Sequence, residues 1–395
     1  MKCISGGDIV ADMKDDFVID VAKEHKYQNQ NDEYYNEFLK WRTDASNPYG
    51  YKFVHDTREH AYIDGEGYID MKPAKAEKKA LGKCCGLIGV TMLVMLLVDV
   101  LGMFVIQYIL GVKTGFNTYY SDYSTAEPFS PPVVYTAMAF RLLKYLIPIA
   151  IFGAFTKIPR KVALPSGKLN YRICGCGVII MLVVMAIGRI ADYLFTNMLH
   201  TINVDSVYSG YIRTHDNSSL AVYIVAQYLL IPILTEILFR GCFLQFFRQF
   251  GDLFAILITS FVNCMCGYDF VQFGYIFCVS LVLGLFTIRT GSLMSAIIMR
   301  LAAQLTTFAV NFVILTADYI PGKIVETVAC LVIFLCSIFI YIGMTGKGEW
   351  NFNIEGDASA LSMGEKIKSA MTSTPLTLWA MLAVAVTVLS LRFLS

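Results

Sequence analysis

The chain has 395 residues, of which 56% are hydrophobic and only 16% are charged. Soluble domains are about 25% charged and rarely expose so much apolar surface, so this composition excludes a disordered chain and a disulfide-stapled mini-domain and argues against a soluble enzyme. The formal net charge of +1 combines two unlike parts, because residues 1–71 carry a net charge of −7 and residues 72–395 carry +8.

Residues 1–83 are predicted to form a soluble, acidic N-terminal tail followed by a basic juxtamembrane segment. Residues 1–71 contain no apolar run long enough to span a bilayer, and they lack the basic start, apolar core and cleavage site of a secretory signal. The aromatic and acidic residues between Gln28 and Tyr51 favour a short helix at 31–42 or a partner-binding surface. The alternative is a solvated, partly disordered tail.

Long apolar runs separated by polar residues begin at residue 84. A helix needs about 20 apolar residues to cross about 30 Å of hydrocarbon, and backbone groups in lipid must be satisfied within the segment. We therefore predict an all-α fold, a polytopic transmembrane helix bundle of eight or nine spans over residues 84–344 and the C-terminal helix. The predicted spans are 84–112, 133–155, 173–195, 219–239, 253–267, 271–288, 292–316, 322–344 and 377–394.

Two stretches of this pattern leave alternatives open. Residues 253–288 contain Gly267 and Asp269 near the middle, which favours two short helices with a tight reversal. After a polar segment at 345–376, the C-terminal helix at 377–395 either crosses the membrane, giving nine spans, or lies on its surface, giving eight.

The basic residues of the short loops predict the orientation of the bundle. Five lysines lie between residue 72 and the first span, and five basic residues lie between residues 157 and 172, whereas the loops on the other side are nearly bare. The N-terminus is therefore expected in the cytoplasm, together with segment 345–376, in a multi-pass protein of a bacterial-type plasma membrane. Membrane lipid is the first expected partner.

The sequence carries no pattern for a cofactor, a metal or a nucleic acid. The eleven cysteines lie mostly inside the apolar runs, without paired CxxC motifs, which predicts small apolar fillers rather than zinc ligands. No histidine occurs between residues 216 and 395, which excludes a histidine-ligated metal among those helices. A glycine-rich phosphate loop and a nucleic-acid motif are also missing from the sequence.

Ionisable residues inside the predicted spans need a reason, because a charge in the bilayer is costly. The first three spans contain Asp99, Arg141, Lys144, Arg189 and Asp192. Arg189 and Asp192 are three residues apart, so they can form a local ion pair. For Arg141 and Lys144 the sequence leaves two alternatives, side chains that snorkel to the surface or side chains that face a cavity.

The densest group of polar residues lies in the fourth span, where Glu236 and Arg240 are four residues apart on one helix face. A structural salt bridge explains this spacing alone. The strings TEILFRG, SFVNCM and LGLFTIRTGSLMSAIIMRLAAQ, within about 219–316, resemble the CAAX protease and bacteriocin-processing (CPBP) family, the type II CAAX prenyl endopeptidase group. The phrase from Leu283 to Ala296 is the most specific part. The resemblance implies a helical membrane bundle with an active site inside the bilayer near its cytoplasmic side.

The resemblance also implies a set of chemical positions, most of which carry other residues in this chain. Glu236 and Arg240 match the second Glu and the Arg of an EExxxR motif, and Phe261 matches the Phe of FxxxH. The substituted positions are Thr235 for the water-activating Glu, Met265 for the His of FxxxH, and Arg300 and Gln304 for the final His and Asn. Thr and Met cannot act as bases near neutral pH, and one positioned base contributes about 10²–10⁴-fold to a rate, so catalysis is expected to be largely lost.

The polar substitutes suggest that the interior of the bundle stays polar at this position. We predict that Glu236, Arg240, Arg300 and Gln304 form an internal network, in which Arg300 pairs with Glu236 across the bundle. A salt bridge would then stand where the family has its catalytic water.

Three functions are consistent with these observations. The first is a non-catalytic CPBP homologue that binds a peptide or a membrane-protein partner in the former substrate cavity. The second is an active intramembrane endopeptidase with Glu236 as its sole base and Arg300 as the electrophile. The third is a transporter or permease subunit, although the sequence shows no inverted repeat with broken helices.

Overall fold

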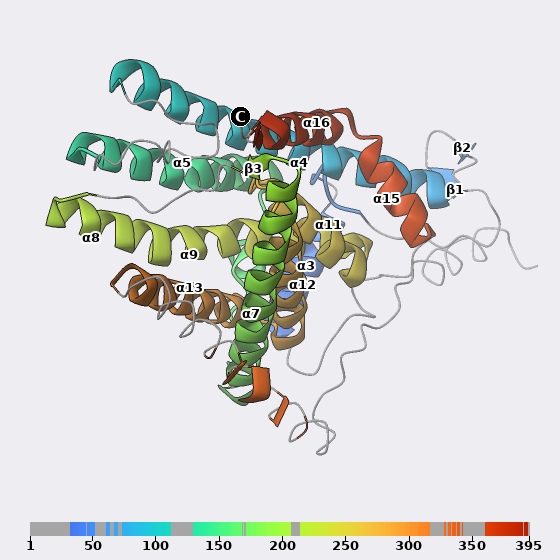
Figure 1. The fold of residues 1–395 in the computed structure, drawn as a ribbon. Coiled ribbons are helices and arrows are strands. Elements are labelled where there is room, and N and C mark those ends of the chain that lie inside the picture. Colours follow the sequence, from blue (N-terminus) through green and yellow to red (C-terminus); the bar gives the residue numbers. More distant parts are fainter. Residues whose placement is uncertain are drawn as a thin grey trace, which may run out of the picture.

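The computed structural model of the protein describes residues 32–51, 61–63, 67–69, 73–111, 129–206, 214–316 and 360–393, apart from single positions inside these ranges, and isolated residues between 328 and 342. The tail before residue 32, most of the predicted span 322–344 and residues 345–359 lie outside the described residues. Helices make up most of the described chain (Figure 1). The predicted fold class, an all-α bundle of membrane-spanning helices, is confirmed.

The helices and strands have the following bounds. The helices are α3 (Asp32–Thr43), α4 (Pro73–Phe104), η1 (Val105–Ile109), α5 (Pro131–Thr156), α6 (Arg160–Ala163), α7 (Tyr171–Thr201), α8 (Asn217–Val225), η2 (Ala226–Leu230), α9 (Ile231–Glu236), η3 (Ile237–Phe243), α10 (Leu244–Phe247), η4 (Arg248–Phe250), α11 (Asp252–Met265), α12 (Phe273–Thr290), α13 (Leu293–Thr316), α15 (Met363–Met371) and α16 (Thr374–Leu389). Two antiparallel strand pairs are short, β1 (Ala61–Ile63) with β2 (Gly67–Ile69) and β3 (Val204–Ser206) with β4 (Leu391–Phe393).

Within the described residues, five helices are long and apolar enough to cross a membrane, and the bent pair α15 and α16 is a sixth candidate. The five are Ala74–Ile109, Pro131–Thr156, Tyr171–Thr201, Asn217–Phe250 and Phe273–Thr290. Figure 1 shows α7 running across the direction of α5 and α9. Because most of 322–344 lies outside the description, the count of eight or nine spans stays a prediction.

The stretch 253–288 forms two helices with a tight reversal, as its central Gly and Asp predict. Helix α11 ends at Met265 and α12 begins at Phe273. In the turn, Tyr268 has a positive φ of 48°, and the Asp269 carboxylate accepts a 2.9 Å hydrogen bond from the backbone N–H of Val271. Helix α11 has 14 residues and is about 21 Å long at 1.5 Å per residue, too short to span a bilayer.

The fourth apolar run is one continuous helical segment that contains two wide π-helical stretches, η2 and η3. Pro232, near the start of α9, has no N–H to bond to the preceding turn, which accounts for the widened helix just before it. At the other end Asp216 caps α8. Its carboxylate accepts hydrogen bonds from the Ser218 hydroxyl (2.6 Å) and from the backbone N–H of Ser219 (2.8 Å). These bonds lower the pKa of Asp216 to about 2.

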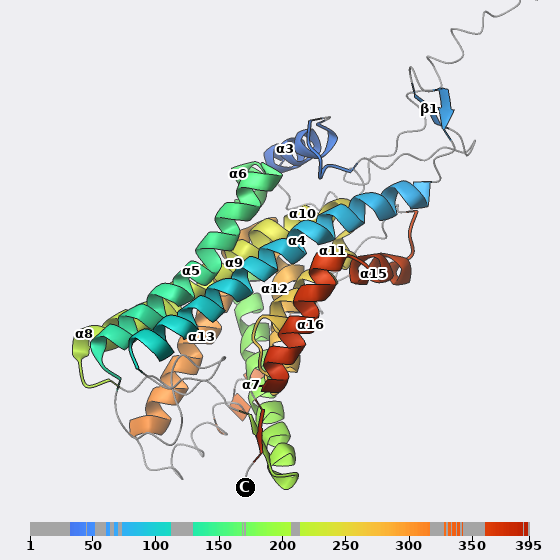
Figure 2. The ribbon, with the colours of Figure 1, turned by 90° about the horizontal axis from the view of Figure 1, so that it is seen from above.

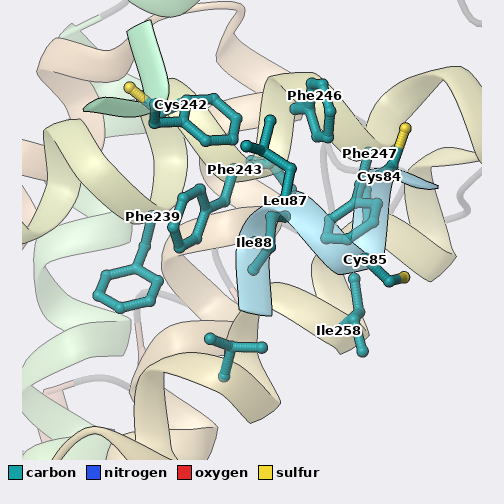
Figure 3. Packing of buried hydrophobic residues seen from close by; sticks show 14 of the residues in the cluster. Cys84, Cys85, Leu87, Ile88, Phe239, Cys242, Phe243, Phe246, Phe247 and Ile258 are labelled. Atoms are coloured by element: carbon teal, nitrogen blue, oxygen red, sulfur yellow. The ribbon is translucent and has the colours of Figure 1, made fainter. Parts of the chain in front are cut away.

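The main core is rich in phenylalanine and lies where α4 meets η3 and α10 (Figure 3). Figure 3 shows Leu87 and Ile88 of α4 among the rings of Phe239, Phe243, Phe246 and Phe247. Phe152 of α5 completes the cluster, with its ring centroid 5.1 Å from those of Phe243 and Phe246 in edge-on geometry. Such ring pairs contribute about 0.5–1.5 kcal/mol each beyond the area they bury. The core therefore fixes α4 and α5 against the helix that carries Glu236.

Residues 32–51 pack onto one end of the bundle. The predicted helix at 31–42 is confirmed as α3, which buries Tyr34, Phe38 and Trp41 in the main core. The Trp41 indole Nε1 donates a 3.0 Å hydrogen bond to the backbone oxygen of Thr156, the last residue of α5. Figure 2 shows α3 beside α6 at this end. The alternative of a solvated tail is wrong for this part of the chain, because its aromatic side chains find an apolar partner.

Hydrogen bonds between polar side chains also hold residues 32–51 on the bundle. Arg248 donates a 2.8 Å hydrogen bond to the Tyr34 hydroxyl, which donates one of 2.5 Å to Gln245 Oε1. Burial raises the pKa of the Tyr34 phenol, so its hydroxyl keeps the proton that it donates. Arg248 also binds Asp252 through two hydrogen bonds, Nε to Oδ1 at 2.7 Å and Nη2 to Oδ2 at 3.2 Å. The end of the fourth span is thus held by buried, paired polar groups.

The two basic residues of the second span both face the protein interior rather than snorkelling. Lys144 Nζ lies 2.7 Å from Asp99 Oδ2, and it also stands 5.1 Å from the ring centroid of Tyr268. Arg141 donates a hydrogen bond to Gln227 Oε1. The Asp99 pair joins α4 to α5 inside the bundle, a contact that no local spacing in the sequence indicates.

Candidate functional site

Glu236 and Arg240 form a buried ion pair on the fourth span. Glu236 is the last residue of α9 and Arg240 lies in the π-helical segment η3, and both side chains are at most 1% exposed. Arg240 Nε lies 3.2 Å from Glu236 Oε2. Wide π-helical turns are frequent at functional sites, and this one follows the carboxylate directly. The predicted salt bridge within the helix is present.

Arg240 also ties the ion pair to the two neighbouring helices. Its Nη2 donates a 3.0 Å hydrogen bond to the backbone oxygen of Ser280 in α12, and the Ser280 hydroxyl lies 2.6 Å from Asn263 Nδ2 in α11. Sequence reasoning missed Asn263 and Ser280. Asn263, the one amide in the string SFVNCM, is a usable signal, whereas a serine in an apolar helix gives none.

Thr235 and Met265, at the positions where the motifs have Glu and His, supply no side-chain base. The Thr235 hydroxyl donates a 2.8 Å hydrogen bond to the backbone oxygen of Ile231 in its own helix. Met265, at the end of α11, is half-buried and packs against the main core. Thr235 sits beside Glu236 in the chain, and α11 contacts η3, so both substituted positions lie on elements of the site.

Arg300 and Gln304 lie one turn apart on α13, which packs against α9 and η3. Because α13 contacts both elements of the ion pair, the positive charge of Arg300 acts on Glu236 and on Arg240. Among the described residues, however, the salt bridge of Glu236 within 4.0 Å is to Arg240, and Arg300 acts from farther away. Both Arg300 and Gln304 are half-buried. Their membership of one network with Glu236 stays a prediction.

Several polar atoms at this position have hydrogen-bonding capacity left over. Within the described part of the chain, Glu236 Oε1 and Oε2, Arg240 Nη1 and Arg300 Nε are buried without a hydrogen-bond partner. A buried polar atom without a partner costs about 1–3 kcal/mol, and more when it is charged. These atoms, contributed by three elements, are therefore the groups here that would gain most from a polar ligand. The described residues contain no group of three or more His, Cys, Asp or Glu that could hold a metal ion.

The TGS string fixes the start of α13 and has a structural role. Gly291 has a positive φ of 61° and ends α12. The loop before α7 pairs with this turn, because Gly167 N donates to Gly291 O at 3.0 Å and Leu293 N donates to Pro165 O at 2.8 Å. The most specific phrase of the motif therefore positions the helix that carries Arg300.

Gly241, the glycine of TEILFRG, is predicted to be indispensable for packing. A Cβ there would stand 2.5 Å from the backbone oxygen of Ala163, which cannot move without shifting α6. We expect Gly241→Ala to lower the free energy of unfolding by about 1–3 kcal/mol, measured by denaturant titration in detergent micelles. Gly175→Ala in α7 is the control, because nothing lies within 4 Å and a helical alanine is favoured by about 0.5–1 kcal/mol. Equal stabilities of the two variants would contradict the close contact.

A comparison with protein families supports the resemblance. The family model described as type II CAAX prenyl endopeptidase Rce1-like matches residues 217–306, from the start of α8 into α13. The chain matches none of the curated proteins and none of the solved structures with which it was compared. The matched range includes all seven residues that the motifs single out, Thr235, Glu236, Arg240, Phe261, Met265, Arg300 and Gln304. Together with the apolar helices, it identifies the chain as a membrane protein with a type II CAAX prenyl endopeptidase Rce1-like segment at residues 217–306.

Proposed function

We propose that this CAAX-protease-like membrane protein is a non-catalytic homologue that binds a peptide or a membrane-protein partner around Glu236. The observation that carries the proposal is the ion pair of Glu236 with Arg240 in a region without histidine. Arg240 Nε already stands 3.2 Å from Glu236 Oε2, so activation of a water by this carboxylate would compete with the ion pair.

The surrounding groups supply no second base for water activation. The Thr235 hydroxyl already donates to Ile231, and the thioether of Met265 cannot take a proton. A general base must lie within hydrogen-bond reach of the water that it activates. Glu236 is fully buried and is the carboxylate of this site, so hydrolysis would require breaking its ion pair first.

Binding of a peptide, in contrast, requires only the polar atoms that the site already contains. A peptide presents carbonyl oxygens and N–H groups, or a terminal carboxylate, which are partners for Arg300 Nε, Arg240 Nη1 and the Glu236 oxygens. Retained polar capacity without a second base favours recognition over turnover. We further propose that the N-terminus lies in the cytoplasm and that the membrane is a bacterial-type plasma membrane, since basic residues are concentrated in segments 72–83 and 157–172.

The test of the proposal is a cleavage assay with membrane-tethered reporter peptides in proteoliposomes. We expect no turnover by this protein under conditions in which an active CPBP protease cleaves the reporter. Arg300→Gln is expected to weaken binding of a fluorescent peptide by at least about tenfold, because one hydrogen bond to a charged group contributes about 1.5–3 kcal/mol.

Two outcomes would overturn this reading. Reporter cleavage that disappears in Glu236→Ala would assign the protein to the active endopeptidases. Solute flux into the same proteoliposomes, lost in the same variant, would favour a permease.

A further inference from the structure

Helix α15 and the first turns of α4 form a basic surface. It contains no residue of the candidate site. We call it the α15 surface and define it by Lys75, Lys78, Lys79, Lys368 and the apolar stripe of α15. Figure 2 shows α15 beside α4 and at a steep angle to α16. The bend between α15 and α16 is 77°, so α15 cannot continue the direction of an apolar helix that crosses the bilayer.

Two hydrogen bonds to other parts of the bundle hold α15 in this orientation, and a capping box fixes its first turn. Lys366 Nζ donates a 2.5 Å hydrogen bond to the backbone oxygen of Phe250, at the end of the fourth span. The backbone N–H of Ala360 donates to Glu77 Oε2 at 2.9 Å, which ties the start of the segment to α4. Ser362 and Glu365 form a capping box at the N-terminus of α15. The helix is therefore a fixed part of the bundle.

The remaining side chains of α15 divide into an apolar and a polar face. Ile367 and Met371 are four residues apart and 45% and 50% exposed, and Met363 extends the same stripe by one turn. Lys368 and Glu365 are exposed on the polar face. An apolar stripe next to a polar face is typical of a helix that lies in the plane of the membrane interface.

Among the described residues, the exposed charges around α15 are predominantly positive. Lys75, Lys78 and Lys79 at the start of α4 are all exposed, as is Lys368. The exposed carboxylate among them is Glu365, which is engaged in the capping box and is influenced by the Lys78 charge. Clusters of basic residues beside an apolar helix attract anionic lipid, with about a factor of five in affinity for each basic residue near the surface.

We propose that the α15 surface binds the headgroups of anionic phospholipids, with its apolar stripe resting in the acyl-chain region. The lysines of α4 and Lys368 contact the phosphates, while Ile367 and Met371 reach the hydrocarbon. A free phosphate would match the lysines but leave the stripe exposed to water. The surface thus selects a lipid rather than a soluble anion, and it anchors the end of the fourth span through Lys366.

The full-length protein in a neutral detergent provides the test. Its thermal unfolding midpoint is followed while phosphatidylglycerol, phosphatidylcholine or inorganic phosphate is added. We expect stabilisation by phosphatidylglycerol alone. The double variant Lys79→Gln/Lys368→Gln is expected to raise the half-saturating lipid concentration about 25-fold, from two basic residues at about fivefold each. Ile367→Ser/Met371→Ser is expected to raise it as well.

The matched control is Lys157→Gln/Arg160→Gln, which removes two exposed positive charges at the junction of α5 and α6. Less than a twofold change is expected for it. Equal shifts in the two charge variants would mean unspecific attraction and would overturn the proposal. Stabilisation by inorganic phosphate equal to that by lipid, or no stabilisation by phosphatidylglycerol, would overturn it too.

Discussion

Glu236→Gln is expected to lower the free energy of unfolding by about 3–5 kcal/mol, because it leaves a buried guanidinium without its counter-charge. Arg240 is held by the Ser280 backbone oxygen and cannot turn to solvent. The charge of Arg300 adds to the penalty, since it acts on Arg240 with the same sign. The measurement is the denaturation midpoint of the purified variant in detergent, together with its yield from membranes.

A surface ion pair of this chain supplies the matched control. Glu33 pairs with Lys161 at a position where both side chains are about 60% exposed, and such pairs contribute about 0–1 kcal/mol. Glu33→Gln should therefore change stability little. The double variant Glu236→Leu/Arg240→Met should recover part of the loss, because it removes both buried charges. Unchanged stability and yield of Glu236→Gln would contradict the polar network around this residue.

The features that the sequence predicts well are those encoded in neighbouring residues. Apolar runs give the helices, and the Gly267 and Asp269 pair gives the reversal between α11 and α12. The four-residue spacing of Glu236 and Arg240 gives their ion pair, because it follows from helix geometry alone. The motif strings also give the family resemblance over 217–306.

The features that the sequence does not predict depend on which helices become neighbours. Asp99 and Lys144 pair across 45 positions, and Arg240 bonds to Ser280 across 40. Every residue has a backbone oxygen, so the residue type at position 280 does not indicate that this oxygen accepts a hydrogen bond from Arg240. Likewise, the TGS turn is read as a family motif, whereas its pairing with Gly167 is a tertiary contact.

The N-terminal segment illustrates both cases. The aromatic and acidic pattern predicts α3. Its contacts with residues about 200 positions later depend on tertiary packing, which the pattern does not show. Tyr34 and Tyr51 reach Gln245 and Gln249, two glutamines buried at the end of an apolar helix. The polar side chains of these two buried glutamines find hydrogen-bond partners in segment 32–51. This segment therefore belongs to the folded unit.

Trp41→Ala is accordingly expected to lower the free energy of unfolding by about 3–5 kcal/mol. The indole packs against Phe38 and Phe246, each with a centroid separation of 6.0 Å, and its N–H binds Thr156 O. The change removes a large buried ring and leaves a carbonyl at the end of α5 without its donor. The variant should also become sensitive to protease between residues 43 and 51, since the segment loses its anchor.

Two further variants separate the contributions of the ring. Trp41→Phe keeps most of the apolar volume and loses the hydrogen bond, so we expect a loss of about 1–2 kcal/mol. Tyr171→Ala removes an aromatic ring that is 84% exposed and should stay within about 0.5 kcal/mol of the parent protein. If Trp41→Ala were as stable as Tyr171→Ala, segment 32–51 would be a tail in solution. If the expected order holds, the acidic N-terminal part contributes to the stability of the membrane bundle, because its anchor lies on the helix that carries Glu236.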